Sequence, residues 1–381
     1  MRCTPERSGA AGRLVATVAV AVLGRVLAAA ACPFCGVVGR SLAERRDAAA
    51  VTAVGESAGP VARDAAGAVT QPFALGQAIR GRAAAGEVAT ARVAGPVAGT
   101  AILFGDAAGW EAEPADEPLL AHVAAAPEAT VPAARRLAWF AARLEDPDPA
   151  IAADAFTEFG QAPFAAVRDA AAAFDAAKLR RWIEEPGIDQ RRRGFYGLAL
   201  GIVAASLPDG DDRRRNVAAL RRAVEASGSD LRAGFDGLLA GIVVAEAEAG
   251  LDYLATRGLL AGDTRAGDAR HALAVLRFAG ENLAATVPRD RVAAATARLL
   301  ANPAVAADAA IDLARYGDWS AVEQVAGLWE PLGRDDPLVR RAVAGYLAAC
   351  PLPVAGERLA RLRQADPDRL RAALEAAAGP R

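Results

Sequence analysis

Apolar positions recur with the period of an α-helix over most of the C-terminal two-thirds of the chain. The stretch from residue 137 to 159 shows the pattern in its shortest form, because two apolar helical faces flank the sequence Asp146-Pro147-Asp148-Pro149. Pro147 ends the first helix, and Asp148 with Pro149 supplies an N-cap oxygen and a first helical residue that needs no amide hydrogen. Two short helices cannot bury both apolar faces alone, so the pattern predicts an array of similar helix pairs.

A glycine-rich pattern, G-F-x-G-L-x-x-G-I-V, occurs twice at an offset of 40 residues, in residues 194–203 and 234–243. Glycine costs a helix interior about 1 kcal/mol relative to alanine, so something must offset its use here. We expect close approach of two helix backbones, at which a Cβ would clash. A ligand groove is the alternative interpretation.

Two segments, DPDPAIAADAF at 146–156 and DDPLVRRAVAGYL at 335–347, resemble the second helices of HEAT-type repeats. Such helices commonly start with Asp-Pro and carry apolar residues at helical spacing, as this sequence does after Asp336-Pro337. The resemblance covers residues 130 to 375 and implies an α-solenoid, a class of fold that offers extended binding surfaces. We assign residues 119–378 to this HEAT-like helical domain.

Residues 48–108 have a different pattern, in which short runs rich in Val, Ile, Thr and Phe alternate with Gly and Pro clusters. The runs predict strands, and their small number favours a small antiparallel barrel or sandwich of OB-like type. The predicted strands are 50–54, 69–79, 87–93 and 100–104. The acidic, Pro-containing stretch 109–118 is predicted to be a linker. The fold class is therefore mainly α with a small N-terminal all-β domain.

The N-terminus has the three-part pattern of a secretory signal peptide, which we place at residues 1–31. Three arginines precede the apolar run 14–23, and the small-residue tract 28–31 follows it. The protein is then exported to the periplasm, cell envelope or exterior, and an uncleaved anchor or lipidation at Cys32 stays open as an alternative. No later stretch is long and apolar enough to span a membrane.

Residues 32–47 form a segment that begins with Cys32-Pro33-Phe34-Cys35. In an exported protein the two cysteines predict a structural disulfide. Thiol-disulfide oxidoreductase activity is the alternative, although no strand precedes the motif as redox-active Cys-x-x-Cys sites require. Closely spaced cysteines followed by an OB-like barrel resemble the start of netrin-type domains, whose distant partner cysteines are missing from this sequence.

The sequence Gly55-Glu56-Ser57-Ala58-Gly59 matches the G-x-S-x-G nucleophile elbow of α/β-hydrolases. An elbow needs several preceding strands, an upstream oxyanion loop and a helix immediately after the serine. Here Pro60 lies where that helix would begin. A turn between two strands is the favoured interpretation. A serine hydrolase with Ser57 as nucleophile and His271 as base is the alternative.

Charge gives no footprint for nucleic acid, because the net charge is −2 and the first 31 residues contain four Arg and one Glu, which leaves −5 for the remainder. We find no metal or cofactor motif: Asp209-Gly210-Asp211-Asp212 lacks the ligand spacing of a calcium loop. The arginine runs 191–193 and 213–215 are expected to pair with Glu184, Glu185 and Asp211, and an acidic partner is the alternative. His122 is expected on a helix surface or in a packed boundary, and Cys350 on an apolar helix face as a core cysteine.

These features predict an exported, non-enzymatic binding or scaffold protein that uses its helical surface for protein–protein interaction. Its partner is an unidentified protein or other envelope macromolecule. An enzyme using Ser57 or the Cys32/Cys35 pair is the alternative.

Overall fold

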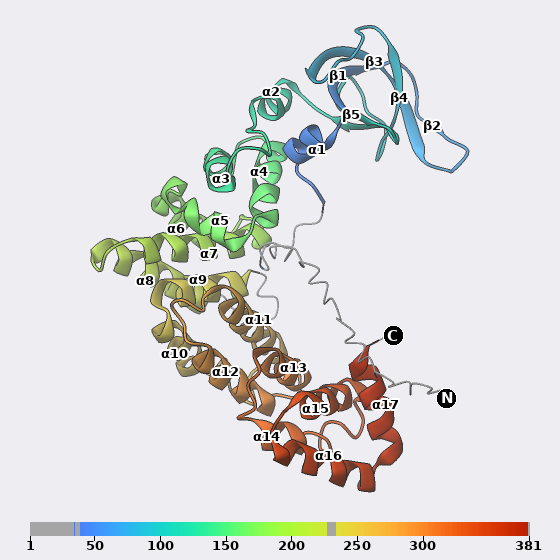
Figure 1. Ribbon diagram of the computed structural model, residues 1–381. Helices are drawn as coiled ribbons and strands as arrows, with labels where there is room; N and C mark the ends of the chain where they lie inside the picture. Colours follow the sequence, from blue (N-terminus) through green and yellow to red (C-terminus); the bar gives the residue numbers. More distant parts are fainter. Residues whose placement is uncertain (1–33, 35–38, 227–233, 380–381) are drawn as a thin grey trace, which may run out of the picture.

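The computed structural model describes residue 34 and residues 39–226 and 234–379. Within them the protein is mainly helical, with a small strand barrel near the N-terminus, as predicted (Figure 1). The predicted signal peptide and both Cys32 and Cys35 lie outside the described residues. The first helix, α1, precedes the barrel and spans Leu42–Ala48.

The barrel is a six-stranded sheet in which β3 pairs with both β1 and β4 and thereby closes a ring. The order around the ring is β1-β5-β6-β4-β3, and all pairs are antiparallel except β4 with β6. Inward side chains alternate with exposed ones along β4, and Phe73 and Leu103 lie in the barrel core. The strands are β1 (Val51–Ser57), β2 (Ala62–Arg63), β3 (Val69–Arg80), β4 (Val88–Arg92), β5 (Thr100–Asp106) and β6 (Gly109–Pro114).

The stretch 109–118 is not only a linker, because it contains β6 and the start of the next helix. Ala112 is the one buried residue of β6, and the acidic side chains around it face outward, so the strand lacks a clear apolar alternation. Pairing with β5 and β4, rather than local hydrophobicity, places this strand. The prediction of a linker was therefore wrong for most of this segment.

Helices fill the remainder of the described chain. They are α2 (Glu117–Ala125), α3 (Ala133–Ala141), α4 (Pro149–Gln161), α5 (Phe164–Asp169), the 3-10 helix η1 (Ala171–Ala173), α6 (Ala176–Glu184), α7 (Gln190–Ser206), α8 (Asp211–Ala226), α9 (Phe235–Glu246), α10 (Glu248–Thr256), α11 (Ala266–Asn282), α12 (Arg289–Arg298), the 3-10 helix η2 (Leu299–Ala301), α13 (Ala306–Tyr316), α14 (Val322–Gly327), α15 (Pro337–Ala349), α16 (Pro353–Ala365) and α17 (Pro367–Ala378).

The predicted Asp-Pro starts are confirmed at α4 and α15. Asp148 Oδ1 accepts a hydrogen bond of 2.8 Å from the backbone N–H of Ala150, and Asp336 Oδ1 accepts one of 2.7 Å from Leu338. In each helix proline occupies the first turn, where its missing N–H costs nothing.

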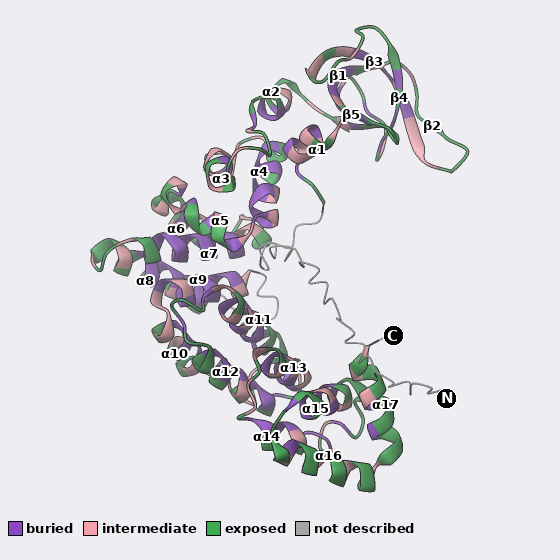
Figure 2. Cartoon of the chain, in the orientation of Figure 1, coloured by how far each residue is buried: buried purple, intermediate pink, exposed green. Residues whose placement is uncertain are grey.

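Helices from α7 onward lie in two rows. The odd-numbered helices α7, α9, α11, α13, α15 and α17 each pack against the next, while α10 contacts α12 and α14 contacts α16. Figure 1 shows the first row on the inner side of a curved array and the second on its outer side. Figure 2 shows the burial that results, with α7 and α9 mostly buried and α8 and α16 largely exposed.

The closest contact between helices joins α7 to α9, where the two copies of the glycine pattern face each other. A Cβ added to Gly201 would lie 2.1 Å from the carbonyl oxygen of Gly241, and one added to Gly237 would lie 2.1 Å from that of Gly194. Real Cβ atoms essentially never come within 3.0 Å of another heavy atom. The predicted close backbone approach is confirmed.

Candidate functional site

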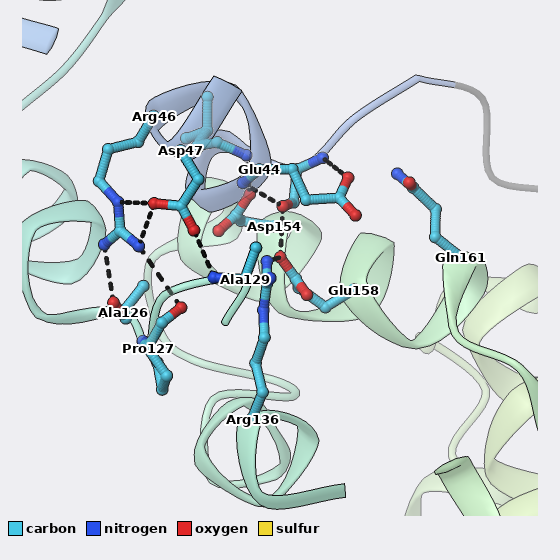
Figure 3. Close-up of polar contacts among 12 residues, drawn as sticks. Glu44, Arg46, Asp47, Ala126, Pro127, Ala129, Arg136, Asp154, Glu158 and Gln161 are labelled. Carbon is cyan, nitrogen blue, oxygen red and sulfur yellow. Dashed lines mark hydrogen bonds and ion pairs between the residues drawn. The ribbon is translucent and has the colours of Figure 1, made fainter. Parts of the chain in front are cut away.

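Helix α1 joins the barrel to the helical region through Arg46 and Asp47 (Figure 3). The Arg46 guanidinium, although buried, donates hydrogen bonds of 2.7 Å to the carbonyl oxygens of Val123 and Ala126 at the end of α2. Asp47 accepts from Arg46 at 2.8 Å and from the backbone N–H of Ala129 at 2.6 Å. These contacts pair a buried charge and satisfy carbonyls that the end of α2 leaves free.

Arg45, next to Arg46 on α1, contacts the barrel. Arg45 lies over the ring of Phe104 at 4.2 Å and donates to Glu113 on β6 at 2.7 Å. An apolar cluster continues this contact, because Ile102 of β5 packs with residues of α2 and with Ile151 of α4. The barrel and the first helices therefore share one packed interface.

A polar stripe on α4, formed by Asp154, Glu158 and Gln161, holds the chain just before α1. The spacing i, i+4, i+7 puts the three side chains on one helical face. Asp154 Oδ1 accepts from the backbone N–H of Leu42 at 2.5 Å, Glu158 accepts from the Ser41 hydroxyl, and Gln161 Nε2 donates to the carbonyl oxygen of Gly39. The stripe thus contacts Gly39 and Ser41, which precede α1, and Leu42, the first residue of that helix.

Glu158 lies at the centre of this stripe and is buried. Burial raises the pKa of its carboxyl above the ordinary value of 4.5, although the Ser41 hydroxyl and the Arg136 guanidinium both act to lower it. Arg136 Nη2 donates to Glu158 Oε1 at 2.5 Å, and the two side chains are only 9% and 5% exposed. The ion pair joins α3 to α4 behind the bound segment.

His122 is buried, and it pairs with Asp154 through the carboxylate oxygen that does not accept from Leu42. Its Nε2 lies 2.8 Å from Asp154 Oδ2, and because a carboxylate can only accept, Nε2 carries the hydrogen. Nδ1 has no hydrogen-bond partner among the described residues, and the ring packs against Trp139 at 5.1 Å. The bond from His122 orients Asp154, and the buried position of His122 agrees with the packed boundary expected from the sequence, not with a helix surface.

Phe34 packs against the aromatic side chain of Phe278 in the helical core. Its ring centroid lies 5.1 Å from that of Phe278 on α11, and Phe278 lies 4.9 Å from Phe164 on α5. Phe34 is 6% exposed, so it is buried as completely as a core residue. We call the pair Phe164 and Phe278 the aromatic socket. The polar stripe therefore contacts residues 39, 41 and 42, and the aromatic socket contacts Phe34 through Phe278.

The residues of the hydrolase alternative lie in different parts of the fold. Ser57 is the last residue of β1, where its hydroxyl accepts a hydrogen bond of 2.7 Å from Gln71 Nε2, and β2 follows instead of a helix. His271 lies on α11, with Nδ1 3.5 Å from Asp236 Oδ2 of α9. The structure therefore does not bring the barrel serine and this histidine together.

Other sequence features have structural partners. Cys350 is buried at the end of α15 and unpaired, as expected of a core cysteine. Arg214 pairs with Asp211 at 2.6 Å, whereas Glu184 pairs with Arg222, at 3.0 Å. In the part of the chain that the structure describes, no group of three or more His, Cys, Asp or Glu side chains is placed to hold a metal ion. None of the helices there has the length and apolar character to cross a membrane.

The polar stripe escaped prediction from the sequence. Asp154 and Glu158 interrupt an otherwise apolar helix four residues apart, which was the available signal. Their partners Leu42 and Ser41 lie 112 and 117 residues away in the chain, so local pattern cannot supply the pairing.

Comparison of this chain with known protein families, characterised proteins and solved structures finds no match.

Proposed function

We propose that the protein is an exported, non-enzymatic binding or scaffold protein whose helical region engages a protein partner. In this proposal the helical region is an α-solenoid of HEAT-like helix pairs. The observation that carries it is the curved two-row packing of the helices, which leaves a long continuous surface on each side of the array (Figure 1).

The barrel is a rigid appendage in this proposal, held by α1 at one end of the array. Its strand order, with β1 between β3 and β5 and a parallel β4–β6 pair, supports an OB-like topology. Export is proposed from the pattern of residues 1–31. The partner is a protein of the cell envelope or exterior.

Site-specific photo-crosslinking on the full chain tests this proposal. Leu338 and Leu352 are exposed leucines of the helical region, and Val88 and Val61 are exposed valines of the barrel, so they form matched pairs of surface apolar positions. With a benzophenone amino acid at each position, we expect adducts in cell-envelope extracts from the helical pair. Adducts confined to the barrel pair, or none from any position, would contradict the proposal.

A further inference from the structure

We propose that the aromatic socket is a binding site for an aromatic side chain of an extended partner segment, and that Phe34 occupies this site in the free protein. The inference rests on the proposed function, because it names the place on the helical region where a partner binds. Its occupant is already visible in the structure: the chain seats one of its own aromatic side chains there.

The socket exists because α7 and α9 pack unusually closely. Phe164 lies on α5, which packs against α7, and Phe278 lies on α11, which packs against α9. Helices α7 and α9 therefore come between α5 and α11 in the order of packing. The glycines let the backbones of α7 and α9 meet, and the flanking rings then reach each other at 4.9 Å. The socket is thus formed by the fold before any ligand enters, which lowers the cost of binding.

The geometry of the site selects an aromatic ring. Phe34 meets Phe278 edge to face, with 65° between the ring planes, and Phe278 meets Phe164 at 90°. Such arrangements pair the positive edge of one ring with the negative face of another, which an aliphatic side chain cannot do. Without Phe34, part of the surface that it covers on this socket would face solvent.

The polar stripe makes Phe34 a tethered competitor. Gly39 and Leu42 are held through backbone atoms and Ser41 through its hydroxyl, and none of these contacts involves Phe34 itself. A displaced Phe34 therefore stays close to the socket, at an effective concentration of roughly millimolar. A partner must bind the socket more strongly than the tethered Phe34 does, which makes binding selective and reversible.

The probe for this site is a synthetic peptide with the sequence of residues 30–38, in which serine replaces both cysteines and 4-fluorophenylalanine replaces the phenylalanine. Binding to the full chain is followed by fluorine NMR line broadening. We expect Phe34→Ala to bind the probe at least tenfold more tightly than the wild type, because the socket is open. The double variant Phe34→Ala/Phe278→Ala is expected to lose this binding, and a peptide with alanine at the aromatic position should not displace the probe.

Equal binding by Phe34→Ala and wild type, or retained binding by the double variant, would overturn the inference. If Phe34→Ala does not fold, Phe34→Leu takes its place, and we expect its affinity for the probe to lie between those of the wild type and an open socket. An affinity equal to that of the wild type would overturn the inference. A wild-type dimer that Phe34→Ala converts to a monomer would assign Phe34 to the socket of a second copy and reject occupancy within one chain. A partner crosslinked to the helical region, together with a probe that fails to bind, would reject the socket but leave the proposed function standing.

Discussion

At the scale of single residues, Ala247, which links α9 to α10, has a strained backbone conformation. Its φ of 53° and ψ of −121° belong to a region that suits glycine, because a Cβ there crowds the neighbouring backbone. The position is held by a hydrogen bond of 2.8 Å from its N–H to the carbonyl oxygen of Val243 and by the two helices on either side. The surrounding fold therefore imposes this conformation.

We expect Ala247→Gly to raise the free energy of unfolding by about 1 kcal/mol, since relief of a strained φ outweighs the added freedom of the unfolded chain. Urea denaturation followed by circular dichroism measures the change. Ala218→Gly, at an exposed position inside α8, is the matched control and should lower stability by about 1 kcal/mol. A loss of stability in both variants would show that Ala247 is not strained.

The buried carboxyl of Glu158 should make the stability of the protein depend on pH. Burial raises the pKa of its carboxyl in the folded state, so the folded protein binds a proton at a pH where the unfolded chain does not. The contribution of this carboxyl to stability is therefore fully present below its unfolded pKa and is lost as pH rises through its folded pKa.

Glu158→Gln tests that sign, because a carboxamide resembles the protonated carboxyl and does not titrate. Relative to this variant, the wild type should gain stability as pH falls from neutral toward the ordinary range of glutamate, which chemical denaturation at a series of pH values measures. Glu185→Gln removes an exposed negative charge and serves as control. Parallel curves for wild type and Glu158→Gln would refute the assignment.

At the scale of helices and strands, the glycine interface between α7 and α9 makes an unusual prediction. Alanine favours a helix over glycine by about 1 kcal/mol, yet we expect Gly237→Ala to destabilise the protein. The new Cβ would lie 2.1 Å from a backbone oxygen of α7, which cannot move without separating the helices. Overpacking of this kind typically costs about 1–3 kcal/mol.

Gly356→Ala is the matched control for that substitution. Gly356 lies in the exposed face of α16, and a Cβ there meets nothing within 4 Å. It should stabilise the protein by up to about 1 kcal/mol, in line with helix propensity alone. Opposite signs for the two variants in thermal melts are expected, and the same sign in both would contradict close packing of α7 against α9.

The elements that the sequence predicted well depend on neighbouring residues. Asp148 and Asp336 begin their helices with side-chain bonds to amides two residues ahead, so the signal is local. Strand β6 was missed because its pairing with β4 and β5 comes from distant parts of the chain, while its own residues are mostly exposed. Local chemistry predicts where these helices begin, whereas pairing with distant strands places β6 in the barrel.

At the scale of the whole molecule, the candidate site could not be predicted from the sequence, again because its contacts join residues that are distant in the chain. The stripe of Asp154, Glu158 and Gln161 and the contact of Phe34 with Phe278 each join residues more than 100 positions apart. Helices were predictable because apolar positions recur locally at helical spacing. The contact of Phe164 on α5 with Phe278 on α11 depends instead on packing between helices that are distant in sequence.

Helix α1 holds the barrel on the helical array through Arg46 and Asp47. Arg46 is 4% exposed and its guanidinium binds two carbonyls of α2, while Asp47 next to it accepts from Arg80 of β3 at 3.3 Å. Arg46→Ala would leave those two carbonyls without this donor, while Asp47 would keep its bonds from Arg80 and the Ala129 amide. A buried acceptor that loses its partner costs about 1–3 kcal/mol.

That cost falls on the junction rather than on either core, so we expect Arg46→Ala to loosen the barrel from the helical region while both stay folded. Small-angle X-ray scattering should show a larger radius of gyration, and limited proteolysis should cut the full chain between β6 and α2. Arg40→Ala, at an exposed arginine just before α1, should leave both measurements unchanged. Identical scattering by Arg46→Ala and wild type would mean that the apolar cluster around Ile102 and Ile151 holds the junction without the help of Arg46.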